Sequence, residues 1–293
     1  MYNISNFYKF TPLNPDNLED IRATLTTIAK EHNLIGLMLI APEGVNATIA
    51  GTKEAIELFE KATINITGPI TAKYSTCEKA PFPRFKIKIK KEIVALKDPA
   101  VLPRPEAKRL SPQEWHAMME DEDVVVLDTR NWYETDLGKF KNALDYRIEH
   151  FSDLPKVLEE KQIPKDKKVL MYCTGGIRCE KASTAMEKMG YKEVYELDGG
   201  ILNYLEKMPN KDFEGECFVF DHRVAVRQDL SPSERYDLCP HCGQPGDIPK
   251  SCANCQTNIK VCAPCNTNHP QNICSKRCRI ELAKAKETQQ PVR

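Results

Sequence analysis

In the first third of the chain, some segments repeat apolar residues with the period of a helix, and others alternate apolar and polar residues as strands do. Residues 14–34 carry apolar side chains at intervals of three and four, which predicts an amphipathic helix, and residues 52–63 repeat that pattern. Strand-like runs occupy residues 7–10, 34–51 and 84–96, and a Pro-Glu-Gly turn divides the second run in two. This β-α-β-β-α-β order predicts a ferredoxin-like α+β sandwich.

A proline-rich segment marks the end of this pattern. Residues 98–109, DPAVLPRPEAKR, contain three prolines and few apolar side chains. Such a composition is typical of a linker between domains. We therefore expect the sandwich domain to span residues 1–97.

The middle of the chain alternates continuous apolar runs with helical segments. VVVLDTR (residues 124–130) and KKVLMYC (residues 167–173) read as strands that are buried on both faces. A helix capped by Ser111 precedes the first run, and a helix over residues 180–190 follows the second. Strands that alternate with helices predict a parallel α/β sheet, here over residues 110–210.

Charge and overall composition limit the classes of partner. The chain has 42 Lys and Arg residues and 42 Asp and Glu residues, so its formal net charge is zero. A nucleic acid would therefore need a local basic surface. The sequence has no apolar run near 18 residues, and its first residues lack the pattern of a signal peptide. These features predict a cytoplasmic protein with no membrane partner.

The segment CTGGIRCEKAS, residues 173–183, joins the second buried strand to the helix behind it. Ligands of open α/β sheets gather at this edge. Two successive glycines let the backbone N–H groups face one point, and such a nest at a helix N-terminus favours an anion. We therefore predict an anion-binding loop of Cys173, Thr174, Gly175, Gly176, Ile177 and Arg178. The loop should lower the pKa of the Cys173 thiol and hold a solvent-reachable thiolate.

Cys179 follows Arg178 directly and permits two interpretations. It is either a redox partner that forms a disulfide with an oxidised Cys173 or protects it, or a small residue that packs the helix start. Spacing alone does not establish that the two sulfurs meet. We count Cys173, Arg178 and Cys179 as the expected catalytic residues.

Two levels of family resemblance follow from these motifs. CTGGIR resembles the active loop of the rhodanese superfamily, whose cysteine carries a persulfide, and LDTR (with Asp128 and Arg130) and LDGGILNYL (residues 197–205) resemble that domain's other signature segments. Phosphatase-like relatives have a loop that is one residue longer, so the resemblance disfavours a phosphatase.

The segments APEGVNATIAG, PFPRFKIKIKKEIV, CTGGIRCEKAS and CFVFDHRVAV, in this order, resemble the bacterial tRNA uridine hydroxylase family over nearly the whole chain. This resemblance implies the oxygen-dependent formation of 5-hydroxyuridine at the wobble position of tRNA, with molecular oxygen as co-substrate. No nucleotide cofactor is evident, and no DNA partner is expected.

A chemical hypothesis connects the loop to that reaction. If the Cys173 thiolate adds to carbon 6 of uracil, carbon 5 becomes enolate-like and can react with dioxygen. Arg178 and the loop amides would stabilise the negative charge that develops. Two alternatives stay open: a sulfurtransferase that uses a persulfide on Cys173, and a non-catalytic adaptor that binds RNA or protein.

A basic strand is the predicted RNA surface. In PFPRFKIKIKKE the lysines alternate with apolar residues, which places Lys86, Lys88 and Lys90 on one face. Together with Arg84 they could bind tRNA phosphates. The alternative is a solvated face whose lysines prevent strands from pairing edge to edge.

The last part of the chain has the pattern of a metal-binding tail. Eight of the twelve cysteines form four close pairs, which are Cys239 and Cys242, Cys252 and Cys255, Cys262 and Cys265, and Cys274 and Cys278. Tetrahedral zinc takes two ligands from each of two such knuckles, so the tail over residues 211–293 is expected to hold two structural zinc ions. Interleaved and sequential pairing both stay open, as does a ligand role for His269; His241 is a weaker candidate.

The tail begins with a β-like extension. It contains Asp221, His222 and Arg223. We expect the acid and the arginine to form a structural ion pair and the histidine to have no catalytic role.

Overall fold

The computed structural model describes residues 1–98, 100–104 and 106–288. Contacts within the chain divide it into two compact units. The first unit comprises residues 1–218 and 226–231, and the second comprises residues 219–225 and the described chain from residue 232 onwards. The first unit contains an N-terminal and a central domain.

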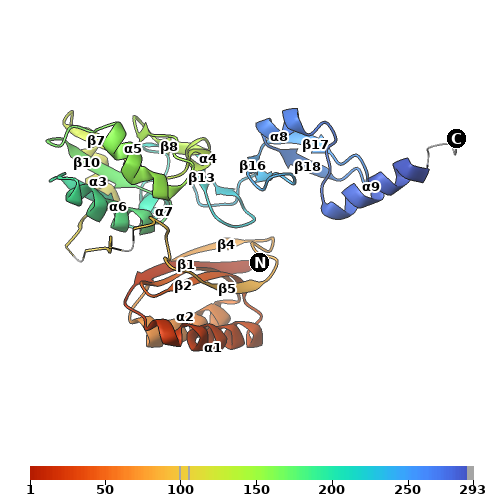
Figure 1. Ribbon diagram of the computed structural model, residues 1–293, viewed down its shortest axis with the longest axis horizontal. Coiled ribbons are helices and arrows are strands. Elements are labelled where there is room, and N and C mark those ends of the chain that lie inside the picture. The colour runs from red at the N-terminus through yellow and green to blue at the C-terminus, as the bar shows by residue number, and fades with distance from the viewer. Residues whose placement is uncertain (99, 105, 289–293) are drawn as a thin grey trace. The chain divides into compact units, whose positions relative to one another are not determined.

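The N-terminal domain is a five-stranded sheet with two helices on one face (Figure 1). Its strand order is β4-β1-β3-β2-β5. The elements are β1 Tyr2–Phe10, a 3₁₀ turn Pro15–Asn17, α1 Leu18–Glu31, β2 Ile35–Ala41, β3 Gly44–Gly51, α2 Lys53–Thr67, β4 Thr71–Cys77 and β5 Phe85–Ile89.

The apolar side of the helices explains why this layer forms. Leu25 of α1 and Phe59 of α2 pack with Phe7 and Met38 of the sheet, and all four side chains are fully buried. Burial of each such side chain contributes about 1.5–3 kcal/mol. The predicted α+β sandwich is confirmed.

One strand of this domain differs from the prediction. The sequence pattern assigns the last strand of the motif to residues 84–96, but β4 closes the ferredoxin-like motif, and β5 adds a fifth strand that pairs in parallel with β2 at the sheet edge. β4 reads TAKYSTC and has few large apolar side chains, so its alternation is weak. These residues therefore form a strand because they pair with β1, and their own periodicity does not predict it.

The other face of the sheet carries polar and basic side chains in rows. The strand pairing places Lys73 of β4 opposite Asn6, Asn6 opposite Thr48, Thr48 opposite Leu37, and Leu37 opposite Lys86 of β5. Residues that are paired in this way share one face of the sheet. Lys86 therefore lies on the same face as Lys73.

The central domain contains a parallel sheet, as predicted. Its strand order is β6-β11-β10-β7-β9, and every pairing in this sheet is parallel. The elements are β6 Lys108–Leu110, α3 Pro112–Met118, β7 Val124–Asp128, α4 Trp132–Thr135, β8 Gly138–Phe140, β9 Leu144–Asp145, a 3₁₀ turn Phe151–Asp153, α5 Leu154–Glu160, β10 Lys168–Tyr172, α6 Ile177–Lys188, β11 Val194–Leu197 and α7 Gly200–Lys207. Ser111 caps α3 through a capping box with Glu114.

Strand β10 is buried on both faces, as its apolar run predicts. Val169 and Met171 belong to the core beneath α5 and α6. Tyr172 belongs to an aromatic group on the opposite face with Trp115 and Phe140. The chain that leaves β10 is consequently anchored by packing on two sides.

The N-terminal and central domains are joined by buried contacts. Leu96 and Val101 pack into the core of the central domain. The Lys181 ammonium group, on α6, is fully buried and lies 2.7 Å from carboxylate oxygens of both Glu43 and Glu92. These contacts fix α6 against the N-terminal sheet.

The second unit is built from short strands and two helices. Its antiparallel pairs are β15 with β16 and β17 with β18. The elements are β15 Asp237–Leu238, β16 Pro245–Gly246, β17 Ile248–Ser251, β18 Asn258–Val261, α8 Ala263–Asn268 and α9 Lys276–Thr288. Before it, the chain forms β12 Phe213–Gly215, which pairs with β8, and the short strands β13 Cys217–Phe218 and β14 Ala225–Val226. Over the described chain, none of the helices combines the length and the apolar character needed to cross a bilayer.

Candidate active site and metal centres

Cys173 is the first residue after β10, at the carboxyl edge of the parallel sheet. α6 begins at Ile177, three residues earlier than the predicted helix, so Arg178 and Cys179 lie in its first turn. Gly176 caps this helix with φ +100°, a conformation that favours glycine. The loop is therefore short and ends directly on a helix N-terminus.

The backbone amides of the loop face the sulfur of Cys173. The Gly176 N–H donates a hydrogen bond to Sγ at 3.1 Å. Burial alone would raise the pKa of this thiol, but a hydrogen bond from the Cys179 thiol, the positive charge of Arg178 and the N–H groups of Arg178 and Gly175 lower the pKa well below its usual value. These backbone N–H groups, which we call the amide cup, form an anion-binding nest at the helix N-terminus and favour the thiolate form of Cys173.

Cys179 meets Cys173, which spacing alone could not establish. Its Sγ lies 3.9 Å from the Thr129 hydroxyl oxygen, and that hydroxyl donates to the carbonyl oxygen of Tyr172 at 2.9 Å, so the Cys179 thiol lies beside the start of the loop, where it contributes to the lowered pKa of Cys173. Burial and the negative charge of Cys173 raise the pKa of Cys179. The two shifts favour a thiolate on Cys173 and a protonated thiol on Cys179.

The expectation of a solvent-reachable thiolate is wrong for this conformation, because Cys173 is 0% exposed. The N-terminal sheet covers the loop: the Lys73 ammonium donates to the Gly175 carbonyl oxygen at 3.1 Å, and the Tyr8 hydroxyl donates to Glu180 at 2.8 Å. Sequence reasoning on the loop alone could not find this cover, since it comes from another domain.

The start of α7 also closes on the loop. Ile201 N–H donates to the Cys173 carbonyl oxygen at 3.0 Å. A Cβ added to Gly200 would lie 2.5 Å from that oxygen and 2.8 Å from the Gly176 nitrogen. Only glycine permits this approach, which gives the LDGG segment a physical role in shaping the loop.

Arg178 is paired rather than free. Its guanidinium donates two hydrogen bonds to the Glu134 carboxylate at 2.6 and 2.8 Å, and the Glu134 side chain is fully buried. Glu134 also accepts a hydrogen bond from Thr174 at 3.3 Å. Glu134 was not predicted from the sequence, because it lies 44 residues before Arg178 and belongs to no recognised motif.

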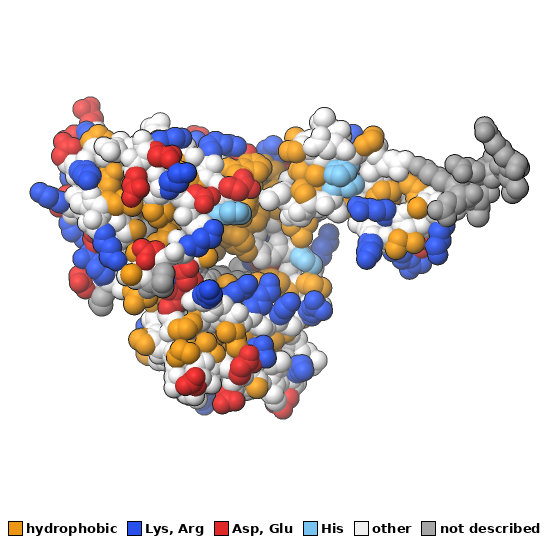
Figure 2. Space-filling model, viewed as in Figure 1, with side chains coloured by type: hydrophobic (Ala, Val, Ile, Leu, Met, Phe, Trp, Pro, Cys, Tyr) orange, Lys and Arg blue, Asp and Glu red, His pale blue; other side chains and the backbone are white. Residues whose placement is uncertain are grey.

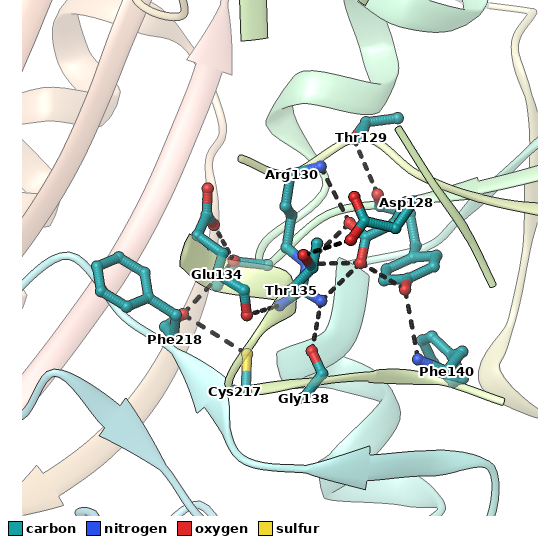
Figure 3. A network of polar contacts seen from close by, with 12 residues as sticks. Asp128, Thr129, Arg130, Glu134, Thr135, Gly138, Phe140, Cys217 and Phe218 are labelled. Carbon is teal, nitrogen blue, oxygen red and sulfur yellow. Dashed lines mark hydrogen bonds and ion pairs between the residues drawn. The ribbon is translucent and has the colours of Figure 1, made fainter. Parts of the chain in front are cut away.

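A second buried ion pair supports the base of the site (Figure 3). The Arg130 guanidinium donates to Asp128 at 2.6 Å and to the Gly138 carbonyl oxygen at 2.6 Å. Asp128 also accepts a hydrogen bond from the Tyr172 hydroxyl at 2.6 Å. Both charged side chains are 0% exposed, so we assign this LDTR pair a structural role.

A cleft of about 530 Å³ opens beside the loop within the first unit. That volume lies in the range of small-molecule sites. Its lining residues come from the N-terminal sheet, the loop, the first turn of α6 and the end of β11 with the turn after it, among them Tyr8, Lys73, Gly176, Glu180, Glu196 and Asp198. The cleft therefore reaches the loop at Gly176 but stops short of the buried sulfur.

Buried charge shapes this cleft. Burial raises the pKa of Glu196 to about 7; a 2.5 Å hydrogen bond from Ser183 opposes the rise, and the charge of Glu180 adds to it. Burial lowers the pKa of Lys73, and the negative charges of Cys173, Asp198 and Glu180 oppose that change. Ser183 thus orients Glu196.

The predicted RNA-binding residues lie away from the loop, on β5 and next to it. Arg84, Lys86 and Lys90 are exposed and Lys88 is half-buried. Ile87, which alternates with them, is buried against the helices, so the two-residue period is confirmed. Lys and Arg side chains gather along the strand side of the N-terminal domain (Figure 2).

The eight tail cysteines form two clusters with interleaved pairing. Within each cluster all sulfurs lie within 4.8 Å of one another. One cluster is Cys239, Cys242, Cys262 and Cys265, and the other is Cys252, Cys255, Cys274 and Cys278.

The hairpin of β17 and β18 explains why consecutive knuckles do not share a site. Ser251 pairs with Asn258 at its turn and Ile248 pairs with Val261 at its open end. Cys252 therefore leaves one end of the hairpin and Cys262 the other, roughly 10 Å apart at 3.3 Å per residue. The first knuckle lies at the open end, where Cys239 packs with Val261 and Cys262, and the fourth lies at the turn, where the Cys274 N–H donates to the Cys252 sulfur, so the pairing is interleaved.

The sulfur spacing fits a tetrahedral metal. Sγ atoms lie 3.5 Å apart for Cys242 and Cys262, and 3.6 Å apart for Cys255 and Cys274. Four thiolates at about 2.3 Å from a zinc ion lie ~3.8 Å from one another. These separations are too long for disulfides and close to those of a four-sulfur site.

His241 and His269 belong to neither cluster. The His269 and His241 rings stack with their centroids 4.5 Å apart and an angle of 7° between the planes. Asp221 and Arg223 form the expected ion pair at 2.6 Å, but they lie in a turn between β13 and β14 and not in a β run. His222 is exposed.

Three known protein families match successive parts of the chain. The family described as UPF0176 acylphosphatase like domain matches residues 2–93, the rhodanese-like domain matches residues 111–207, and the rhodanase C-terminal family matches residues 214–279. These matches agree with the α+β domain, the parallel sheet and the cysteine-rich tail. Among solved structures, the rhodanese-like domain of an Anabaena protein is 18% identical with a TM-score of 0.32, covering 36% of this chain and 78% of that one.

Curated relatives share most of the chain. A protein of Bdellovibrio bacteriovorus is 45% identical over 97% of this chain and 82% of its own length. A protein of Synechococcus elongatus is 40% identical over 87% of this chain and 96% of its own length. Both relatives are named tRNA uridine(34) hydroxylase.

Proposed function

Because the chain belongs to the tRNA uridine(34) hydroxylase family and is therefore an enzyme, we propose that it hydroxylates carbon 5 of the wobble uridine of tRNA. The observation that carries the proposal is the Cys173 sulfur, held as a thiolate in an amide cup beside a cleft of ligand size. Neither alternative, the sulfurtransferase nor the adaptor, is favoured by the names of the relatives. A tRNA substrate places the enzyme in the cytoplasm.

Cys173 is the proposed nucleophile. Its thiolate adds to carbon 6 of uracil, and the electron pair of the double bond moves to make carbon 5 enolate-like. The N–H groups of Gly175, Gly176 and Arg178 that hold the sulfur keep it ionised in a buried site. Molecular oxygen is the proposed co-substrate and takes up the electron pair at carbon 5.

The uridine can reach the Cys173 sulfur only when the N-terminal sheet moves away from the loop. The Lys73 and Tyr8 contacts hold the N-terminal sheet over the loop. We place the uridine first in the cleft, next to Gly176, with Arg178 and Glu134 as positioning residues that keep the loop in shape. Release of the Lys73 contact would then bring the base to Cys173.

Replacement of Cys173 by Ser tests this function. We expect Cys173→Ser to abolish 5-hydroxyuridine, because a serine hydroxyl is not ionised at neutral pH and adds poorly to uracil. Cys77→Ser, in the N-terminal domain, is the matched control and should retain the modification. The measurement is mass spectrometry of tRNA nucleosides from cells that lack the protein and re-express each variant.

The same strains separate the alternatives. Unchanged 5-hydroxyuridine in the Cys173→Ser strain would exclude a role for the thiolate. Sulfur transfer from thiosulfate by the wild-type protein, without hydroxylation, would identify a sulfurtransferase. tRNA binding with neither activity would identify an adaptor.

The basic strand is the proposed tRNA surface. Lys86 lies on the edge strand β5, and the strand pairing places it on the same face of the sheet as Lys73 of the opposite edge strand β4, so both can contact a tRNA backbone that crosses this face. We expect the double variant Lys86→Glu/Lys88→Glu to weaken tRNA binding and to reduce the slope of log K against log salt by about one for each phosphate that the protein no longer neutralises.

The control for this prediction changes charge on the helix side. Lys30→Glu/Lys61→Glu gives the same change of net charge on α1 and α2 and should leave binding and its salt slope unaltered. Equally weakened binding in the two double variants would instead mean that only the total charge matters.

We further propose that the two four-cysteine clusters hold zinc. Eight thiolates complete two tetrahedral sites, Cys239, Cys242, Cys262 and Cys265 in one and Cys252, Cys255, Cys274 and Cys278 in the other. A zinc ion with four thiolate ligands has no open position, so its contribution is structural.

A further inference from the structure

The inference below rests on the proposed function. Hydroxylation by dioxygen requires electrons from a reductant. One oxygen atom enters the product and the other leaves as water, so each turnover consumes two electrons and two protons besides the substrate. A pair of thiols that becomes a disulfide releases two electrons and two protons. The site contains such a pair.

Cys173 and Cys179 meet the geometric conditions for that reaction. The Thr129 hydroxyl donates to the carbonyl oxygen of Tyr172 at 2.9 Å and lies 3.9 Å from the Cys179 sulfur, which places that sulfur beside the residue that precedes Cys173, and both cysteines are 0% exposed. Cys179 is held in place from the far side by the hydroxyl of Thr129. The pKa of Cys179 is raised, which favours a protonated thiol next to the Cys173 thiolate.

We propose that the Cys173–Cys179 dithiol is the electron donor of each hydroxylation and that Cys179 is therefore a catalytic residue. Dioxygen first forms a C–O bond to carbon 5 and becomes a hydroperoxide. Loss of the carbon 5 proton restores the ring double bond and breaks the S–C6 bond, which frees the Cys173 thiolate. The thiolate then attacks the outer peroxide oxygen, the O–O bond breaks, and the ring oxygen takes a proton to give 5-hydroxyuridine.

Cys179 takes part in the second half of the reaction. Cys173 is now a sulfenic acid, S–OH, and the sulfur of Cys179 attacks it. An S–S bond forms, and hydroxide leaves with the Cys179 proton as water. The overall reaction converts uridine, dioxygen and two thiols into 5-hydroxyuridine, one disulfide and one water, in which atoms and electrons balance.

Burial explains why the donor belongs to the protein. Lys73, Tyr8 and the start of α7 enclose the loop, so a thiol from solution cannot reach Cys173 in the closed conformation. Cys179 already lies against it. A small thiol or a dithiol protein then reduces the disulfide after the site opens.

A single-turnover experiment tests the proposal. The full-length, metal-loaded enzyme is reduced, freed of reductant without oxygen, mixed with excess tRNA that lacks the modification, and exposed to oxygen. We expect about one 5-hydroxyuridine per enzyme, together with a Cys173–Cys179 disulfide in the unreduced peptide map. Added dithiothreitol should convert this burst into continuous turnover.

Two variants sharpen the result. Cys179→Ala should still give up to one product per enzyme, but Cys173 should remain a sulfenic acid that a dimedone reagent traps, and turnover with dithiothreitol should be slower. Cys77→Ala, the control cysteine of the N-terminal domain, should behave as wild type. A structural role of Cys179 would not produce a trapped sulfenic acid.

The outcomes that contradict the inference differ from those that contradict the function. Many turnovers without added thiol, or product without the disulfide, would show that the electrons come from elsewhere. Cys179→Ala with an unchanged rate and no dimedone adduct would remove Cys179 from the reaction. Absence of product even with dithiothreitol would instead reject the hydroxylase function itself.

Discussion

Removal of metal from the tail is expected to unfold the second unit while the first unit stays folded. The two cysteine clusters are packed with few other apolar side chains, chiefly Val261 and Ile259 in one and Ile273 and Leu282 in the other. So small a core cannot offset the entropy of ordering the chain. Zinc bound by four thiolates supplies about 10–16 kcal/mol in isolated zinc modules, which is ample to fold this one.

The measurement is metal content together with limited proteolysis. The purified protein should contain two zinc ions per chain, and a strong chelator should make the residues after 232 susceptible to protease. Cys262→Ala should lower the zinc content to one ion, whereas Cys77→Ala, outside the clusters, should leave two. A chelated protein with an intact, protease-resistant tail would show that the fold does not need the metal.

Truncation of Glu134 is expected to destabilise the central domain strongly. The carboxylate is fully buried and receives two hydrogen bonds from the Arg178 guanidinium. Glu134→Ala leaves that guanidinium buried without its counter-charge, which costs roughly 3–5 kcal/mol. The loop that carries Cys173 should lose its shape in the same variant, so hydroxylation should fall as well.

Both tryptophans of the chain, Trp115 and Trp132, lie in the central domain, so their fluorescence during urea unfolding reports on it. Asp136→Ala is the matched control, because Asp136 forms an exposed ion pair with Arg147 that should contribute little. The double variant Glu134→Ala/Arg178→Met removes both charges and should recover part of the stability. If the single variant is no less stable than the Asp136 control, the buried pair does not hold the domain.

The local chemistry of the active loop could be predicted from the sequence. An apolar run, two glycines and a helical period are properties of neighbouring residues, and they place Cys173 at a strand end with amides around it. The structure confirms that arrangement through the Gly176 hydrogen bond to sulfur. The eight cysteines that make up the two clusters were predictable for the same reason, since each knuckle is a short local motif.

The surroundings of the loop were not predictable in this way. Glu134 neutralises Arg178, and Lys73 and Tyr8 cover the thiolate, yet these residues are 44 to 172 positions distant from their partners. Strand β4 gives another example, because its side chains carry little periodic signal and its pairing with β1 decides its conformation.

By itself, the sequence predicted the strands and helices of the central domain, the cysteine at the strand end and the eight cysteines of the four knuckles, because periodicity and spacing act over a few residues. Only the tertiary structure decided which knuckles share a metal site, that Cys179 touches Cys173, and that the thiolate is closed off from solvent. The physical reason is that these three features depend on where distant segments meet. The β17–β18 hairpin separates Cys252 from Cys262, and the N-terminal sheet closes over a loop that its own residues would leave open.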